Sequence, residues 1–381
     1  MKVKKQILTA LMLFSILVVS IEKINLGTLA DTSGDSPLPM YHQEMIYDVE
    51  NNQTIMFGGS ITGGSSADLE STWVLSSINL TWNKLQDANS PGGRYSHRMV
   101  YNTLTGKILL FGGITYAAGA QVNDTWEFDP ATNQWTELHP ANAPAVRAAH
   151  GMYFDPDFNE VVLHAGVNSP TTVNDEVWIY NFSANNWTQL FPTGGPGTGY
   201  GHSFLYDEIN KVGVLFGGRF ADHTLKNDVW FFNRSSVTWT KKIPILKPLE
   251  RYHLSMAYNP SDDTFVIFGG DNDDTPSRAL DDTWVYNPQT NQWTEINTNL
   301  KPPARCKHKM IYDQYLNKII MFGGTGEAFS VSYNDMWIYD PVTETWSQEL
   351  TSTVPVPLLI IFTSLMSAIS AIHYIKKRRE N

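Results

Sequence analysis

Four arginines that recur at one position of a repeating sequence are the side chains best suited to bind a ligand. They are Arg94, Arg147, Arg251 and Arg305. A guanidinium group holds a carboxylate through two parallel hydrogen bonds, so the pattern predicts recognition of an acidic group. The alternative is architectural, because an arginine buried between repeats can instead satisfy main-chain carbonyl groups. Both interpretations stay open at this point.

Histidines recur three residues after the arginine position, at His97, His150, His202 and His308. We expect them to be architectural, because symmetric repeats would hold the imidazoles too far apart to share one metal ion. The sequence contains no nucleophile–histidine–acid arrangement and no phosphate-binding glycine loop. It therefore predicts no catalytic residue, no metal site and no cofactor.

Six further candidate ligand-binding residues lie in segments whose length varies between repeats: Tyr116, Arg219, Phe220, His223, Arg278 and Phe329. Aromatic side chains beside polar groups are typical of surfaces that bind carbohydrate or peptide. The run from Asp271 to Asp274 offers oxygen ligands for calcium. It lacks the glycine and the downstream glutamate of a known calcium loop, which favours a solvated acidic loop.

The elements that carry these residues repeat six times with a period of 52–54 residues. All twelve tryptophans form six pairs, and the two members of each pair are nine residues apart. Five units carry a Gly-Gly pair. An aromatic residue stands eleven positions before that site in all six units, at Tyr47, Tyr101, Phe154, Tyr206, Tyr258 and Tyr312. A period of this length indicates a repeat architecture.

Each unit predicts four short antiparallel strands, A to D, which in the second unit are residues 97–102, 108–111, 126–128 and 135–138. Four strands repeated radially predict an all-β, six-bladed β-propeller, whereas the repeats of a linear β-solenoid are usually shorter. The expected blades span about residues 40–87, 94–140, 147–192, 199–243, 251–297 and 305–350. Each blade is complete in sequence, so we expect side-chain packing between the first and last blades to close the ring.

These units resemble the kelch repeat. The resemblance is carried by an Arg-x-x-His before strand A, a Gly-Gly after strand B, an aromatic pair on strand C and a tryptophan nine residues later, over about residues 40–350. Single units depart from it at Met40, Gln43, Ala165, Gly199 and Leu254. The resemblance implies a kelch-type propeller, in which arginines at this position line the pocket when the ligand is an acidic peptide or sugar.

Only one interval within the units changes in length. From the second glycine to the first tryptophan the spacing runs 14, 13, 12, 12, 14 and 13, whereas the step from the second tryptophan to the strand-A histidine position is always 15. The variable segment is the B–C loop, which shares a face with the D–A loops in an antiparallel meander. Variable loops on a rigid scaffold are typical of a binding face, with drift in a tolerant loop as the alternative.

Both ends of the chain predict a membrane-anchored protein. Residues 1–30 have the lysines, apolar stretch and small final residue of a signal peptide, with an uncleaved anchor as the alternative. An apolar run from 354 predicts a transmembrane helix over 358–375, followed by a basic tail, 376–381. Linkers 31–39 and 351–357 flank the propeller. These signals predict a single-pass cell-membrane protein with an extracellular propeller and a cytoplasmic C-terminal tail.

The charge of the chain disfavours nucleic acid as a partner, and its glycosylation motifs suit an outward-facing domain. Residues 31–353 carry a net charge of −17, which disfavours binding to the phosphate backbone of nucleic acid. Asn-x-Ser/Thr triplets suited to glycosylation occur at Asn52, Asn79, Asn123, Asn181, Asn186 and Asn233.

The favoured function is a cell-surface interaction module that recognises a protein or glycan through the B–C loop face. The main alternative is an enzyme at the channel mouth, either a sugar-modifying propeller or a copper oxidase. A resemblance to galactose oxidase would imply copper, two histidines and a Tyr–Cys crosslink, for which the chain offers one cysteine, Cys306, near His308. A structural surface-layer component is a third alternative.

Overall fold

The computed structural model describes residues 36–61, 69–85, 89–169, 172–273, 278–326 and 331–349. The predicted signal peptide, transmembrane helix, basic tail and second linker lie outside these residues, as does Phe329. Among the described residues, no helix has the length and apolar character needed to span a membrane.

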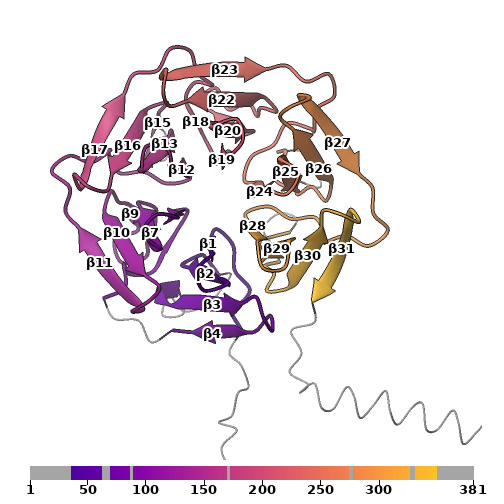
Figure 1. Ribbon diagram of the computed structural model, residues 1–381, viewed down its shortest axis with the longest axis horizontal. Coiled ribbons are helices and arrows are strands. Elements are labelled where there is room, and N and C mark those ends of the chain that lie inside the picture. The colour runs from indigo at the N-terminus through magenta and orange to yellow at the C-terminus, as the bar shows by residue number, and fades with distance from the viewer. Residues whose placement is uncertain are drawn as a thin grey trace, which may run out of the picture. The chain divides into compact units, whose positions relative to one another are not determined.

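Six four-stranded antiparallel sheets follow one another along the chain and form a ring (Figure 1). Strand A lies innermost and strand D outermost (Figure 1). The strands of blades one to three are β1 (Glu44–Asp48), β2 (Gln53–Phe57), β3 (Thr72–Ser76), β4 (Trp82–Lys84); β6 (Arg98–Asn102), β7 (Lys107–Phe111), β10 (Thr125–Asp129), β11 (Gln134–Leu138); and β12 (Gly151–Asp155), β13 (Glu160–His164), β16 (Val177–Asn181), β17 (Asn186–Leu190).

Blades four to six have the same order and are equally self-contained. Their strands are β19 (Ser203–Asp207), β20 (Val212–Phe216), β22 (Val229–Asn233), β23 (Thr238–Lys242); β24 (Ser255–Asn259), β25 (Thr264–Phe268), β26 (Thr283–Asn287), β27 (Gln292–Ile296); and β28 (Lys309–Asp313), β29 (Lys318–Phe322), β30 (Met336–Asp340), β31 (Thr345–Glu349). The first and last sheets share no strand, which confirms the prediction of complete blades.

Short ladders join the D–A and B–C loops of each blade. They include β5 (Arg94–Tyr95) with β8 (Ile114–Thr115), which also pairs with β9 (Ala120–Gln121), and β18 (Gly199–Tyr200) with β21 (Arg219–Phe220). In blade three the bridge between Ala148 and Val167 makes this connection, and β14 (Val167–Ser169) pairs with β15 (Thr172–Val173) within the B–C loop. The other blades have single bridges at the same place, such as Tyr252 with Asp271. Both loop classes therefore lie on one face, as the meander predicted.

Neighbouring blades are held together by a repeated aromatic contact at each seam. The last residue of strand B packs against the strand-D tryptophan of the next blade, with ring centroids 4.7–5.3 Å apart: Phe57–Trp135, Phe111–Trp187, His164–Trp239, Phe216–Trp293, Phe268–Trp346 and Phe322–Trp82. Aromatic pairs of this geometry contribute roughly 0.5–1.5 kcal/mol each beyond the area they bury. The sixth pair joins the last blade to the first.

Main-chain hydrogen bonds also close the ring. The residue two positions before each strand A donates its N–H to the equivalent carbonyl of the preceding blade. The six bonds form a closed cycle: His42 to Lys307 (2.9 Å), Ser96 to His42 (3.1 Å), Ala149 to Ser96 (2.8 Å), Gly201 to Ala149 (2.9 Å), His253 to Gly201 (2.8 Å) and Lys307 to His253 (2.8 Å). We call these six residues the hydrogen-bonded ring. Side-chain packing between the first and last blades therefore contributes to closure as expected, and backbone donors and acceptors of the same blades pair as well, which the sequence did not predict.

Candidate functional site

The channel mouth on the D–A and B–C face is framed by the hydrogen-bonded ring. All six residues adopt a left-handed backbone conformation, with φ between 52° and 69°, and only one of them is glycine. His42 and His253 belong to blades one and five, yet their rings lie 4.8 Å apart. Because blade six separates these two blades, their side chains meet across the mouth.

Burial keeps the two imidazoles at the mouth neutral. Desolvation, and then the charges of His253 and Lys307, hold the pKa of His42 well below its ordinary value. Desolvation and the Lys307 charge lower the pKa of His253 in the same way. Burial also lowers the pKa of Lys307. Neutral imidazoles beside an ammonium group offer both donors and acceptors to a polar ligand.

Tyrosines surround these polar groups, each standing one residue before a member of the hydrogen-bonded ring. The collar consists of Tyr41, Tyr95, Tyr200 and Tyr252. The ring centroid of Tyr252 lies 4.3 Å from that of His253 and 6.1 Å from that of Tyr200. Tyr116 extends the collar outward, since its ring lies 5.5 Å from that of Tyr95. The predicted candidate Tyr116 thus lies beside the mouth.

Loop residues of blades four and five are tied to the collar by ion pairs. Arg219 lies 2.7 Å from Asp273 and stacks over the Tyr252 ring at 5.4 Å. Arg278 pairs with Asp273 and with Asp271, and donates to the Tyr252 hydroxyl at 3.2 Å. These arginines form ion pairs with Asp271 and Asp273, which are the described carboxylates of the run that offered ligands for calcium.

The remaining loop candidates lie farther from these contacts. Phe220 is half-buried and lies under Lys226 at 5.6 Å. His223 is exposed at a left-handed position. Phe220 pairs with Gly199 in the ladder that also contains the collar residue Tyr200, whereas His223 makes no described contact with the collar.

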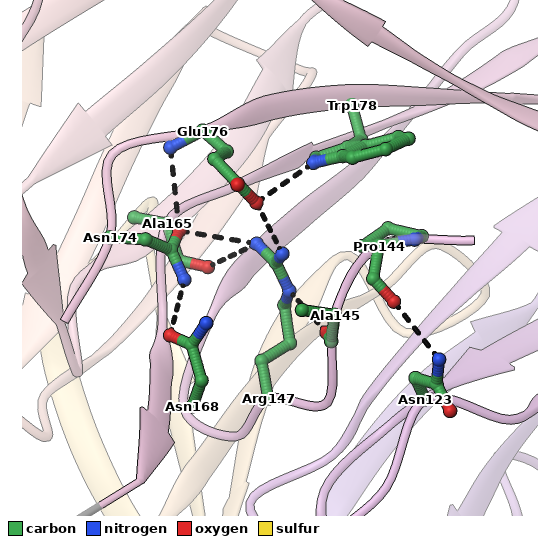
Figure 2. Close-up of polar contacts among 9 residues, drawn as sticks. All are labelled: Asn123, Pro144, Ala145, Arg147, Ala165, Asn168, Asn174, Glu176 and Trp178. Atoms are coloured by element: carbon green, nitrogen blue, oxygen red, sulfur yellow. Dashed lines mark hydrogen bonds and ion pairs between the residues drawn. The ribbon is translucent and has the colours of Figure 1, made fainter. Parts of the chain in front are cut away.

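The four repeated arginines occupy buried slots inside the blades. Figure 2 shows Arg147, which donates to the carbonyls of Ala145 (3.1 Å) and Ala165 (3.0 Å) and binds Glu176 at 2.5 Å. Glu176 also accepts a bond from the Trp178 indole at 3.0 Å, so the carboxylate links the arginine to strand C. Every acceptor that the guanidinium contacts belongs to its own blade or to the D–A loop that leads into it.

The other three arginines repeat this arrangement with aspartate as the partner: Arg94 with Asp124, Arg251 with Asp282 and Arg305 with Asp335. All four arginine side chains are at most 1% exposed. Blades one and four lack this arginine and have Met40 and Gly199 at the aligned position. These contacts match the architectural interpretation and leave no guanidinium edge for a ligand.

The strand-A histidines are also buried between blades. His97, His150 and His308 each lie 5.7–5.8 Å from the strand-B phenylalanine of the preceding blade. Within the described ranges, no three His, Cys, Asp or Glu side chains converge as metal ligands. Burial raises the pKa of the Cys306 thiol to about 12, so this cysteine stays protonated and unreactive at neutral pH.

Only two glycosylation candidates are well exposed. Asn79 and Asn123 are exposed, and the Asn123 amide donates to the Pro144 carbonyl at 3.2 Å (Figure 2). The other four are half-buried: Asn52, Asn181, Asn186 and Asn233.

A cavity within the channel lies toward the opposite face, among the A–B turns. It encloses about 250 Å³ and is lined by strand-A side chains of several blades and by turn residues such as Thr103 and Gln314. Near its inner end Glu44, which is 2% exposed, pairs with Arg98 at 2.9 Å and with Lys309. Strand A of the first blade is thereby linked to both neighbouring blades.

The sequence interpretation missed the mouth residues because it searched the variable loops. The mouth residues stand two positions after the arginine position, where residue type alone gives no sign of a left-handed backbone. His42, His253 and Lys307 stand there, although a left-handed conformation is easiest for glycine. Polar side chains held at a strained position next to a channel are a typical mark of a functional surface.

Comparison with known proteins agrees with this architecture. The F-box/kelch-repeat protein At1g51550 of Arabidopsis thaliana is 26% identical over 333 residues, which are 77% of this chain and 68% of that protein. The dynein alpha chain of the flagellar outer arm of Chlamydomonas reinhardtii is 26% identical over 266 residues, which are 65% of this chain and 6% of that protein. The chain therefore spans about two thirds of the first relative and a small part of the second.

The solved structure of YjhT superposes with a TM-score of 0.64 and 15% sequence identity, covering 83% of this chain and 99% of that one. At this identity the likeness establishes the fold alone. The model of the KLHDC2/KLHL20/DRC7 Kelch-repeats domain matches residues 12–199 and 159–365, which together are most of the chain. With six kelch units in a ring and this match, the chain belongs to the KLHDC2/KLHL20/DRC7 kelch-repeat family.

Proposed function

We propose that this protein is an interaction module that binds a partner protein at the channel mouth on the D–A and B–C face. Kelch propellers are typically protein-interaction modules. The observation that carries the proposal is the tyrosine collar around His42, His253 and Lys307. Tyrosine presents a large, rigid contact area with a polar tip, and such residues dominate the binding energy of interfaces.

The chemistry of the mouth favours a partner segment with hydrogen-bonding groups and a negative charge. Lys307 supplies a cation and the two neutral imidazoles supply donors and acceptors. Arg219 and Arg278 hold the neighbouring loops in place through Asp271 and Asp273. A preorganised surface of this kind loses little conformational freedom when it binds.

We also propose that this face meets its partner outside the cell. The support is the sequence pattern of residues 1–30 and 354–381, which predicts export and a cytoplasmic basic tail. Protease added to intact cells would then digest the propeller and spare the tail. Digestion only after the membrane has been opened would overturn the location and leave the binding proposal standing.

The binding proposal is tested with an identified partner and tyrosine variants of the full-length protein. Partners would come from a surface-protein screen, and affinity would be measured for Tyr95→Ala and Tyr252→Ala. Tyr315→Ala is the matched control, since Tyr315 is 52% exposed and lies in the A–B turn of the opposite face. We expect the collar variants to weaken binding about tenfold or more, as for an interface anchor.

The control variant should bind as the wild type does. Equal loss in Tyr315→Ala, or no loss in either collar variant, would move the binding surface away from the mouth. The same proteins on a glycan array provide the comparison between ligand classes. Collar-dependent glycan binding without any protein partner would replace the proposed function.

A further inference from the structure

The seam between blades three and four differs from the other five seams. His164 stands where the other blades have phenylalanine, at Phe57, Phe111, Phe216, Phe268 and Phe322. The loop that follows strand D of blade three carries Gly194 and Gly195, both with positive φ. These departures meet at one place, where a cavity of about 210 Å³ lies against Trp239.

His164 lines this cavity and has one ring nitrogen without a hydrogen-bond partner among the described residues. Its side chain is 2% exposed, and its Nδ1 lies 3.4 Å from His202 Nε2. Its Nε2 has no hydrogen-bond partner in the part of the chain that the structure describes. Burial lowers the pKa of His202 to about 3, so His202 is neutral and its Nε2 can accept the proton of His164 Nδ1. In that tautomer, His164 Nε2 is a buried acceptor.

Carboxylates stand at the edge of the same cavity. Asp175 and Glu176 line it, together with the glycine loop and Gln189. Glu176 is held in place by Arg147, as described above. Asp175 is exposed. Gly195 lines the same cavity and supplies no charge to pair with this carboxylate.

Blades four and five carry a lysine at this position, whereas blades one and two have Ser90 and Ala143. Eight residues after the second tryptophan, blade four has Lys247 and blade five has Lys301, where blade three has Gly195. Lys247 Nζ lies 3.2 Å from Asp228, which aligns with Glu176. Lys301 Nζ lies 2.9 Å from Asp281, which aligns with Asp175. Both blades therefore place an ammonium group against the acids at the start of strand C.

A second lysine supports the same comparison. Lys241, two residues after Trp239, also binds Asp228, at 2.7 Å. The aligned residue of blade three is Gln189, which is uncharged. In blade three, Arg147 binds Glu176 in place of these lysines, so the remaining difference is at Asp175, which has Gly195 at the position where Lys301 binds Asp281.

We propose that the cavity between blades three and four binds a primary ammonium group, supplied by a lysine side chain of the partner protein. The ammonium would take the place that Lys247 and Lys301 fill in their own blades, with Asp175 as counter-ion and His164 Nε2 as acceptor. The butyl stem would lie along the Trp239 ring, which also attracts a cation. The proposal deepens the proposed function, because it rests on a protein partner as the source of the lysine.

The binding step is tested without any partner. The full-length protein is labelled with 5-fluorotryptophan, and the Trp239 resonance is assigned with Trp239→Phe. The probe is Nα-acetyl-lysine methylamide, and the uncharged control is its norleucine analogue. We expect the lysine probe to shift the Trp239 resonance saturably, while the norleucine analogue does not.

Three variants locate the site. His164→Phe restores the residue of the other five blades, so it should fold and lose the response. Asp175→Asn should weaken the response severalfold. Asp281→Asn is the matched control, because that acid already has Lys301, and it should respond as the wild type does.

No movement of the Trp239 resonance with the lysine probe overturns the proposal. A wild-type response in His164→Phe, or equal weakening in Asp175→Asn and Asp281→Asn, also overturns it. This test of the lysine site can fail while the proposed binding at the tyrosine collar still holds. A partner that binds through the tyrosine collar while the probe has no effect would refute the lysine site alone.

Discussion

Replacing Arg251 with methionine tests whether the repeated arginines are structural. The side chain is fully buried, donates to the carbonyls of Leu249 and Gly269 at 2.9 Å, and binds both oxygens of Asp282 at 2.6 Å. Removing one partner of a buried ion pair costs about 3–5 kcal/mol. Because the Asp282 side chain stays 20% exposed, we expect the lower end, about 3 kcal/mol.

The assay is thermal unfolding of the wild type and the Arg251→Met variant. An unfolding entropy of about 2 cal/mol/K per residue converts that loss into a fall in Tm of about 5 °C for a propeller of this size. Asp282→Asn in the same chain should recover part of the loss, because it removes the unpaired charge. Met40→Leu is the matched control for crowding in the same slot of blade one, and it should lower Tm by less.

Two results would refute this reasoning. A change in Tm below about 1 °C would mean that the ion pair adds nothing to stability. Loss of partner affinity with an unchanged Tm would give the arginine the ligand-binding role that the sequence left open.

Three further predictions concern the ring, the seams and pH. Ala149→Pro removes one N–H donor and the left-handed conformation from the hydrogen-bonded ring, so it should lower Tm by several degrees, roughly the effect of 3 kcal/mol or more; an unchanged Tm would contradict the closed cycle. Trp135→Phe loses the hydrogen bond from Nε1 to Thr72 Oγ1 (2.9 Å), whereas the buried Nε1 of Trp293 has no partner among the described residues. Trp135→Phe should therefore be more destabilising than Trp293→Phe by about 1 kcal/mol, as measured in denaturant titrations. The pKa of His202 falls to about 3 on folding, so the unfolded chain binds its proton first as the pH drops below about 6.5. Stability should therefore decrease from pH 6.5 towards pH 3, and His202→Leu should spare about 2 kcal/mol of that loss at pH 5 in denaturant titrations; parallel pH profiles would contradict the assignment.

Strand positions and blade order could be predicted from sequence because each rests on local signals repeated six times. Strand B of the second blade ends at Phe111, directly before the glycine pair, as its apolar run indicated. The Trp126 and Trp135 spacing placed strands C and D correctly. Each signal fixes a short element against its neighbour in the same blade, where the chain connectivity leaves few arrangements.

The role of the arginines could not be decided in this way. A guanidinium group pairs equally well with a carboxylate of a ligand and with one of its own blade, such as Asp282. The left-handed conformation at His42 and Lys307 has no sequence signature, since both residues are rare at positive φ. By contrast, the cavity at His164 could have been suspected, because phenylalanine occupies the aligned position in the five other blades.

The hydrogen-bonded ring has a consequence for chain connectivity. The bond from His42 to Lys307 has the same geometry as the five bonds between blades that are also covalently linked. The propeller thus has six nearly equivalent joints, of which one lacks a peptide connection. Consider a circular permutant of the propeller in which a linker joins the start of blade one to the end of blade six, and the new ends lie in the D–A loop between blades three and four. It should form the same set of joints in a different order.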